Sequence, residues 1–321
     1  MRSTRSLRAI ALCAVLLAAA GSAAASITLP LPWKDGMRLN YLGRSVQEDV
    51  RGGKTRRTET RETNVLRITE AGSTGFLQVW RTSDTRVQVS GNAEGLENDR
   101  KLALALGKRF EKLSMEAELD AQGNFVRLRN WQALGAAMRE VLLPALLEQN
   151  RARAKAAGSP LDEAALRGRL VPALERITSE QALSSTLGRQ AAVYNFFTGA
   201  SLTRGKPTTY TDVVPSPWSS DVIPTKGSFE LGEVNNNTVT IRWKQGIDPV
   251  KGAAVMRKIV QGLVGQDLPK GEPLPELKLS DTATVVMDRR SGVPLRIQQV
   301  RRIQAGGSVK TTTWTLEKLP D

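Results

Sequence analysis

The sequence contains no histidine, and its single cysteine, Cys13, lies in an apolar segment near the N-terminus. These absences exclude the Ser-His-Asp triad, a cysteine nucleophile after that segment and zinc sites built on histidine. Gly-x-Ser-x-Gly, Ser-x-x-Lys and phosphate-binding P-loop motifs are also missing. We therefore predict no catalytic residues, no cofactor and no metal ion, and a protein that is not an enzyme.

The first 25 residues have the three parts of a secretory signal peptide. Three arginines precede an apolar run over residues 9–21, and small residues follow as far as Ala25. The run is 13 residues long, shorter than the roughly 20 residues that span a bilayer. No Arg-Arg pair precedes it, which favours the general secretory route over the twin-arginine route. We expect cleavage between Ala25 and Ser26, and a periplasmic or secreted protein without a membrane-spanning segment.

Positive charge dominates the chain, with 46 lysines and arginines against 32 acidic residues and a formal net charge of +14. This balance favours anionic partners in general. Residues 54–68 are rich in interleaved threonine and arginine, and threonine favours a strand. Both faces of this strand are polar, so we expect it at a sheet edge or projecting from the sheet. The candidate surface for an anionic partner comprises Arg56, Arg57 and Arg61. Nucleic acid is not expected, because export removes the usual target and no nucleic-acid-binding motif is present.

Strand-like periodicity occupies both ends of the chain and helical periodicity its middle. Strands are predicted over residues 37–50, 54–68, 75–81, 84–90, 208–214, 227–231, 238–244, 277–287, 294–303 and 309–316, and a hairpin of two strands is predicted over residues 115–130. Helices are predicted over residues 99–113, 131–145, 162–177, 178–199 and 248–265, with a linker or flexible loop at 151–160. The pattern predicts a single α+β domain over residues 26–321, mainly an antiparallel sheet or incomplete barrel with several helices packed on one face. An alternative division has two β-rich halves, 26–130 and 200–321, that flank a helical block at 131–199.

Aromatic residues make up only 5% of the chain. Two interpretations stay open for them. They pack in the core between the sheet and the helices, or they line a cavity there that holds an apolar ligand. The candidate cavity residues are Trp80, Trp131, Tyr194 and Phe197.

The order of elements over residues 37–318 resembles the periplasmic lipoprotein-carrier type of fold, in which helices cover an incomplete antiparallel barrel. The Asp…Gly hairpins at 120–123 and 288–292 are similar to those of uncharacterised secreted bacterial β-proteins. This resemblance implies an apolar cavity that holds an acyl chain.

We therefore expect a soluble, non-enzymatic periplasmic binding or carrier module for an apolar or amphipathic envelope molecule, such as a lipid or acyl ligand. The alternative is a cationic structural or interaction protein that binds anionic cell-envelope components, such as an anionic polymer. A third hypothesis is an enzyme that works through carboxylates.

Overall fold

The computed structural model describes residues 26–216, 221–264 and 277–320. The predicted signal peptide, with the cleavage-site residue Ala25, lies outside these residues. Strands account for 49% of the structure and form a large antiparallel sheet accompanied by six helices. The predicted α+β fold class is therefore confirmed.

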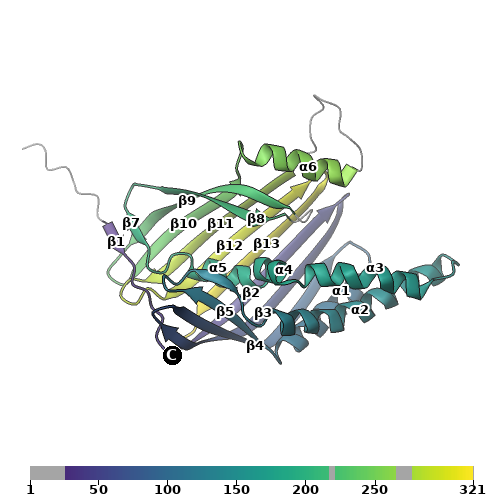
Figure 1. Ribbon diagram of the computed structural model, residues 1–321, viewed down its shortest axis with the longest axis horizontal. Coiled ribbons are helices and arrows are strands. Elements are labelled where there is room, and N and C mark those ends of the chain that lie inside the picture. Colours follow the sequence, from purple (N-terminus) through teal and green to yellow (C-terminus); the bar gives the residue numbers. More distant parts are fainter. Residues whose placement is uncertain (1–25, 217–220, 265–276, 321) are drawn as a thin grey trace, which may run out of the picture.

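One antiparallel sheet of eleven strands dominates the structure (Figure 1). Its strands are β2 (Arg38–Arg51), β3 (Lys54–Gly72), β4 (Gly75–Gly91), β5 (Ser114–Asp120), β6 (Phe125–Leu128), β8 (Thr208–Pro215), β9 (Val222–Val234), β10 (Thr238–Ile247), β11 (Leu277–Asp288), β12 (Pro294–Ala305) and β13 (Ser308–Lys318). They lie in the order β6-β5-β4-β3-β2-β13-β12-β11-β10-β9-β8. The sheet is open, with β6 and β8 at its edges, and is not closed into a barrel. The short strands β1 (Ser26–Thr28) and β7 (Ser201–Thr203) form a separate pair.

The first and last long strands of the chain meet in the interior of this sheet. β2 and β13 pair from Tyr41 opposite Lys318 to Arg51 opposite Ser308. Every other pair of neighbours in the sheet is consecutive along the chain. Strands from both β-rich stretches of the sequence therefore belong to one continuous sheet.

The helices lie over one face of the sheet, which we call the inner face (Figure 1). They are α1 (Leu96–Phe110), α2 (Trp131–Ala156), α3 (Glu163–Ile177), α4 (Glu180–Thr186), α5 (Gly188–Asn195) and α6 (Gly252–Val264). α1 packs on β4, α6 packs on β9, and α4 and α5 contact β6. α2 packs against both α1 and α3, and the α2–α3 pair extends past the sheet.

Two local predictions in the helical block were wrong. The predicted linker begins inside α2, which continues through Pro144 to Ala156. A proline removes one backbone donor, and the packing of α2 on α1 and α3 supplies enough contact to hold the helix beyond it. The helix predicted to begin at Thr178 is instead capped by Ser179, whose Oγ accepts from the Ala182 amide at 3.3 Å. Thr178 is buried, and its hydroxyl donates to the carbonyl oxygen of Leu174.

The main core lies between the inner face and α5. Tyr41 of β2 and Tyr194 of α5 place their hydroxyl oxygens 2.6 Å apart, and both side chains are fully buried. The ring of Trp80 meets Tyr194 edge-on at a centroid distance of 4.9 Å. Beside them, the amides of Gln78 and Asn195 exchange two hydrogen bonds of 3.0 and 2.9 Å. These contacts join α5 to the sheet and fix where the helical block sits.

Candidate functional site

The predicted arginine strand is β3, which lies between β2 and β4. The prediction that it forms an edge or projects from the sheet was therefore wrong. Its apolar residues Leu66 and Ile68 pack in the core near one end, whereas its other end carries the polar run. The polar residues tolerate an interior strand because ion pairs occupy the outer face and a pocket borders part of the inner face.

The three candidate arginines are divided between the two faces of β3. Arg57 and Arg61 lie on the outer face, where both pair with Glu59 at 3.3 and 2.8 Å. Hydrogen bonds from Arg44 first, and then from Arg61, lower the pKa of Glu59 to about 2. Arg56 lies on the inner face, with Nε 2.9 Å from a carboxylate oxygen of Asp99 in α1. Each of these arginines thus has a carboxylate partner within the chain.

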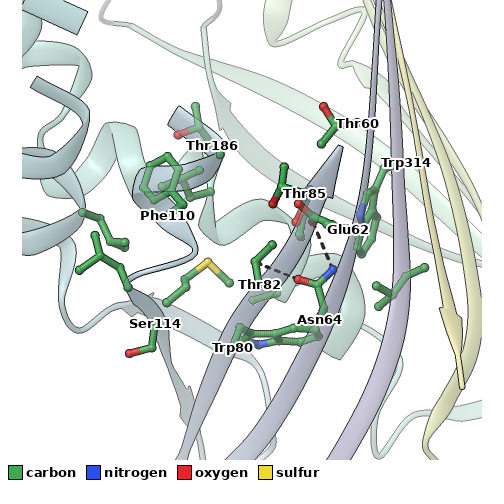
Figure 2. A pocket seen from close by; sticks show the side chains of 18 of the residues that line it. Thr60, Glu62, Asn64, Trp80, Thr82, Thr85, Phe110, Ser114, Thr186 and Trp314 are labelled. Carbon is green, nitrogen blue, oxygen red and sulfur yellow. Dashed lines mark hydrogen bonds between the residues drawn. The ribbon is translucent and has the colours of Figure 1, made fainter. Parts of the chain in front are cut away.

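A pocket of about 290 Å³ lies between the inner face and the helices (Figure 2). β3, β4, β5 and β13 form its sheet side, and residues of α1, α2, α4 and α5 form its helical side. Its apolar walls include Trp80, Phe110, Met115, Leu134 and Trp314. Small-molecule sites are concave and mostly apolar with a few polar groups.

An irregularity in β4 contributes one of the groups at the polar end of the pocket. Thr63 pairs with Ser83 and Arg61 pairs with Arg86, so two residues of β4 lie opposite the single residue Glu62. This is a β-bulge, and Asp84 within it has a φ of 54°, which is uncommon for a residue other than glycine. The bulge changes the alternation of side chains, and it brings Thr85 to the pocket beside Glu62 (Figure 2). The two strands predicted at 75–81 and 84–90 are therefore one strand, β4, with this bulge between them.

A short chain of hydrogen bonds orients the carboxylate of Glu62. Thr82 Oγ1 donates to Asn64 Oδ1 at 3.0 Å, and Asn64 Nδ2 donates to Glu62 Oε1 at 3.2 Å (Figure 2). Burial raises the pKa of Glu62, the Asn64 hydrogen bond lowers it, and the nearby negative charge of Glu111 raises it. Within the described part of the chain, Glu62 forms no ion pair, and the buried hydroxyl of Thr85 has no hydrogen-bond partner. The polar end of the pocket thus holds one carboxylate and one hydroxyl that are available to a ligand.

Of the four predicted cavity residues, Trp80 lines this pocket and the other three do not. Tyr194 and Phe197 are buried in the main core, where Phe197 meets Phe229 at a ring distance of 5.4 Å. Trp131, at the start of α2, packs against a small cluster around Leu134. These three side chains therefore lie in the core or pack against it.

The sequence prediction missed Glu62, Asn64, Thr82 and Thr85. Part of the signal was present, because Glu62 and Asn64 lie on the same strand face as the apolar residues Leu66 and Ile68. A polar pair that continues an apolar face is a sign of a site rather than of a solvated surface. Thr85 could not be found in this way, since the bulge at Asp84 interrupts the period of β4.

Neither the comparison with protein families nor the comparison with curated proteins finds a match to this sequence. Among solved structures, the chain is similar to a structure described as lipid–protein interactions in lipovitellin, with a TM-score of 0.46 and 7% identity. The match covers 89% of this chain and 25% of the lipovitellin chain, so the present chain spans about a quarter of that protein. An outer membrane channel from Pseudomonas putida F1 is matched over 93% of this chain and 98% of the channel, with a TM-score of 0.22 and 8% identity.

None of the helices in the described residues has both the length and the apolar character needed to span a membrane.

Proposed function

We propose that this protein is a non-enzymatic periplasmic binding or carrier module for an apolar or amphipathic molecule of the cell envelope, such as a lipid or acyl compound. The observation that carries this proposal is the pocket between the inner face of the sheet and the helices. Its volume of about 290 Å³ is close to the lower limit of small-molecule sites, about 300 Å³.

The walls of the pocket support an apolar ligand better than a fully polar one. Eleven of the twenty lining residues have apolar side chains, including Trp80, Met115 and Trp314. Burying apolar ligand surface against such walls is favourable by roughly 25 cal/mol per Å². Glu62, Asn64, Thr82 and Thr85 lie together on one side of the pocket (Figure 2), so an amphipathic molecule has a place for both of its ends.

The alternative function, binding of anionic envelope components through a cationic surface, has less support from the arrangement of the candidate arginines. Arg57 and Arg61 share the carboxylate of Glu59, and Arg56 pairs with Asp99 on the opposite face. An anionic partner would have to compete with these carboxylates.

A fluorescent apolar probe and its displacement test the binding function. Ala103 of α1 lines the pocket, so Ala103→Trp should fill it and reduce binding of N-phenyl-1-naphthylamine by about tenfold or more. Ala136→Trp, on an exposed position of α2, is the matched control and should bind like the wild type. Equal binding by both variants would show that the probe does not use this pocket. Native mass spectrometry of protein purified from its own periplasm then identifies the bound molecule, and recovery of only ligand-free protein would count against the carrier function.

Export is tested separately by expressing the full chain in a Gram-negative host and fractionating the cells. We expect the protein in the periplasmic fraction with Ser26 as its first residue. An intact N-terminus in the cytoplasmic fraction would contradict the periplasmic part of the proposal.

A further inference from the structure

We infer that the pocket selects amphipathic molecules whose apolar body ends in a cationic group, such as a protonated amine, which seats against Glu62. This inference rests on the proposed binding function and specifies the chemistry of the ligand. It departs from an acyl ligand with a free carboxylate head.

The charge inside the pocket is opposite in sign to that of the protein. The chain has 46 lysines and arginines, yet among the residues that the structure describes no lysine or arginine lines the pocket, and Glu62 is the one charged lining residue. Glu111, at the end of α1, adds a second carboxylate nearby, where its Oε1 accepts from the Thr85 amide at 2.7 Å. Both groups attract a cation and repel a carboxylate.

The hydrogen-bonding groups at this end also match an ammonium head. Asn64 occupies Oε1 of Glu62, and Oε2 has no partner among the described residues. The Thr85 hydroxyl beside it is buried without a partner. An ammonium group has three donors and no acceptor, so it can donate to the Glu62 carboxylate and to Thr85 Oγ1. An ionised carboxylate head has no donor with which to satisfy Glu62.

Contacts within the protein fix the position of the Glu62 carboxylate before a ligand binds. The Thr82–Asn64–Glu62 hydrogen bonds fix one carboxylate oxygen. Gly107 of α1 lets the helix approach the bulge closely, since a Cβ at this position would lie 2.8 Å from Thr85 Cγ2. Helix and strand therefore close around the polar end, while the apolar side chains of the other walls remain for the body of the ligand.

Three probes with the same chain and different heads test this inference: octylamine, octanol and octanoate, titrated calorimetrically at neutral pH into the full mature protein. We expect octylamine to bind about tenfold more tightly than octanol, because a hydrogen bond to a charged group is worth more than one between neutral groups. Octanoate should bind most weakly. In Glu62→Gln, the affinity for octylamine should fall about tenfold and that for octanoate should rise.

Two further variants separate a local effect from a general one. Glu62→Asp retains the charge and should retain the preference for the amine. Glu233→Gln removes an exposed carboxylate outside the pocket and should leave all three affinities unchanged. Circular dichroism checks that each variant is folded.

The outcomes distinguish this inference from the proposed function. Binding of octanoate as tight as that of octylamine, or an unchanged order of affinities in Glu62→Gln, would overturn the inference and leave the binding function standing. Failure of all three probes to bind the wild type, together with ligand-free protein from the periplasm, would overturn both.

Discussion

Arg189 of α5 places a guanidinium nitrogen 2.7 Å from a carboxylate oxygen of Asp281 in β11, and the Asp281 side chain has no exposed surface. The two residues are 92 positions apart in the sequence, and their pairing connects the helical block to the C-terminal half of the sheet. Arg301, which lies opposite Asp281 on β12, is close to both. Burial first, and then the charge of Arg189, lower the pKa of Arg301 to about 10. Asp281 is therefore the anion that compensates two largely buried cations.

We predict that Asp281→Asn destabilises the protein more than Arg189→Met does. Loss of the carboxylate leaves Arg189 and Arg301 together without an anion, whereas loss of Arg189 leaves Asp281 with Arg301. Breaking a buried pair costs about 3–5 kcal/mol, and the remaining 20% exposure of Arg189 reduces this, so we expect about 3 kcal/mol for Asp281→Asn. Urea unfolding of both variants measures the two losses. Equal losses, or a larger one for Arg189→Met, would contradict this assignment.

Glu62→Gln should stabilise the protein at neutral pH, even though it should weaken the binding of a cationic ligand. Burial raises the pKa of Glu62, so the folded chain binds this proton more tightly than the unfolded chain does. Ionisation of Glu62 therefore lowers stability above the folded pKa, and this cost disappears as the pH falls below the unfolded value of about 4.3.

The measurement is the free energy of unfolding of wild type and Glu62→Gln from pH 3 to pH 8. The two curves should converge at the acidic end and separate as the pH rises. Glu233→Gln, which changes an exposed carboxylate, should show no such divergence. A gap between wild type and Glu62→Gln that is constant across the range would exclude the carboxylate charge as its cause.

Replacing glycine by alanine should change the stability of the protein differently at two helical positions. Gly168 of α3 has no atom within 4 Å of an added Cβ, so Gly168→Ala should raise stability by about 0.5–1 kcal/mol through helix propensity. At Gly107 the added methyl would lie 2.8 Å from Thr85 Cγ2, so the same gain is lost to the clash. Thermal unfolding compares the two variants, and a stabilised Gly107→Ala would show that α1 can move away from the bulge without cost.

The amides of Gln78 and Asn195 should behave as a coupled pair. Replacing only Gln78 by leucine leaves the buried Asn195 amide with unsatisfied groups, which costs about 1–3 kcal/mol. Replacing both by leucine removes both polar groups, so the double variant should lose less stability than the sum of the single variants. A double-mutant cycle in urea gives this coupling energy directly. Strict additivity would show that the reciprocal hydrogen bonds do not contribute as a unit.

Strands and helices were predicted well where the signal came from residues a few positions apart in the sequence. A strand was predicted over residues 37–50, and the structure has β2 at Arg38–Arg51, with the alternating residues Leu39 and Tyr41 buried. Asp248 was predicted to open a helix, and its carboxylate accepts from the Val250 and Lys251 amides just before α6. Such signals depend on side chains a few residues apart, so the sequence alone carries them.

The candidate site was harder to predict because it depends on contacts between distant segments. Trp80 was identified as a cavity residue, and it lines the pocket. Tyr194 was identified with it, but the hydroxyl of Tyr41 at 2.6 Å places it in the core instead. An aromatic side chain in a periodic pattern has the same local signal in either role, and only its neighbours in space distinguish them.

The sequence by itself determined the charge of the chain, the absence of imidazole, and the mainly antiparallel α+β class, since these follow from composition and from periods of two and 3.6 residues. Tertiary structure alone decided that β2 pairs with β13, because local periodicity does not indicate which strands far apart in the sequence become neighbours. It also decided the place of Glu62. The bulge at Asp84 and the approach of α1 at Gly107 turn one polar position of an arginine-rich strand into the charged end of an apolar pocket.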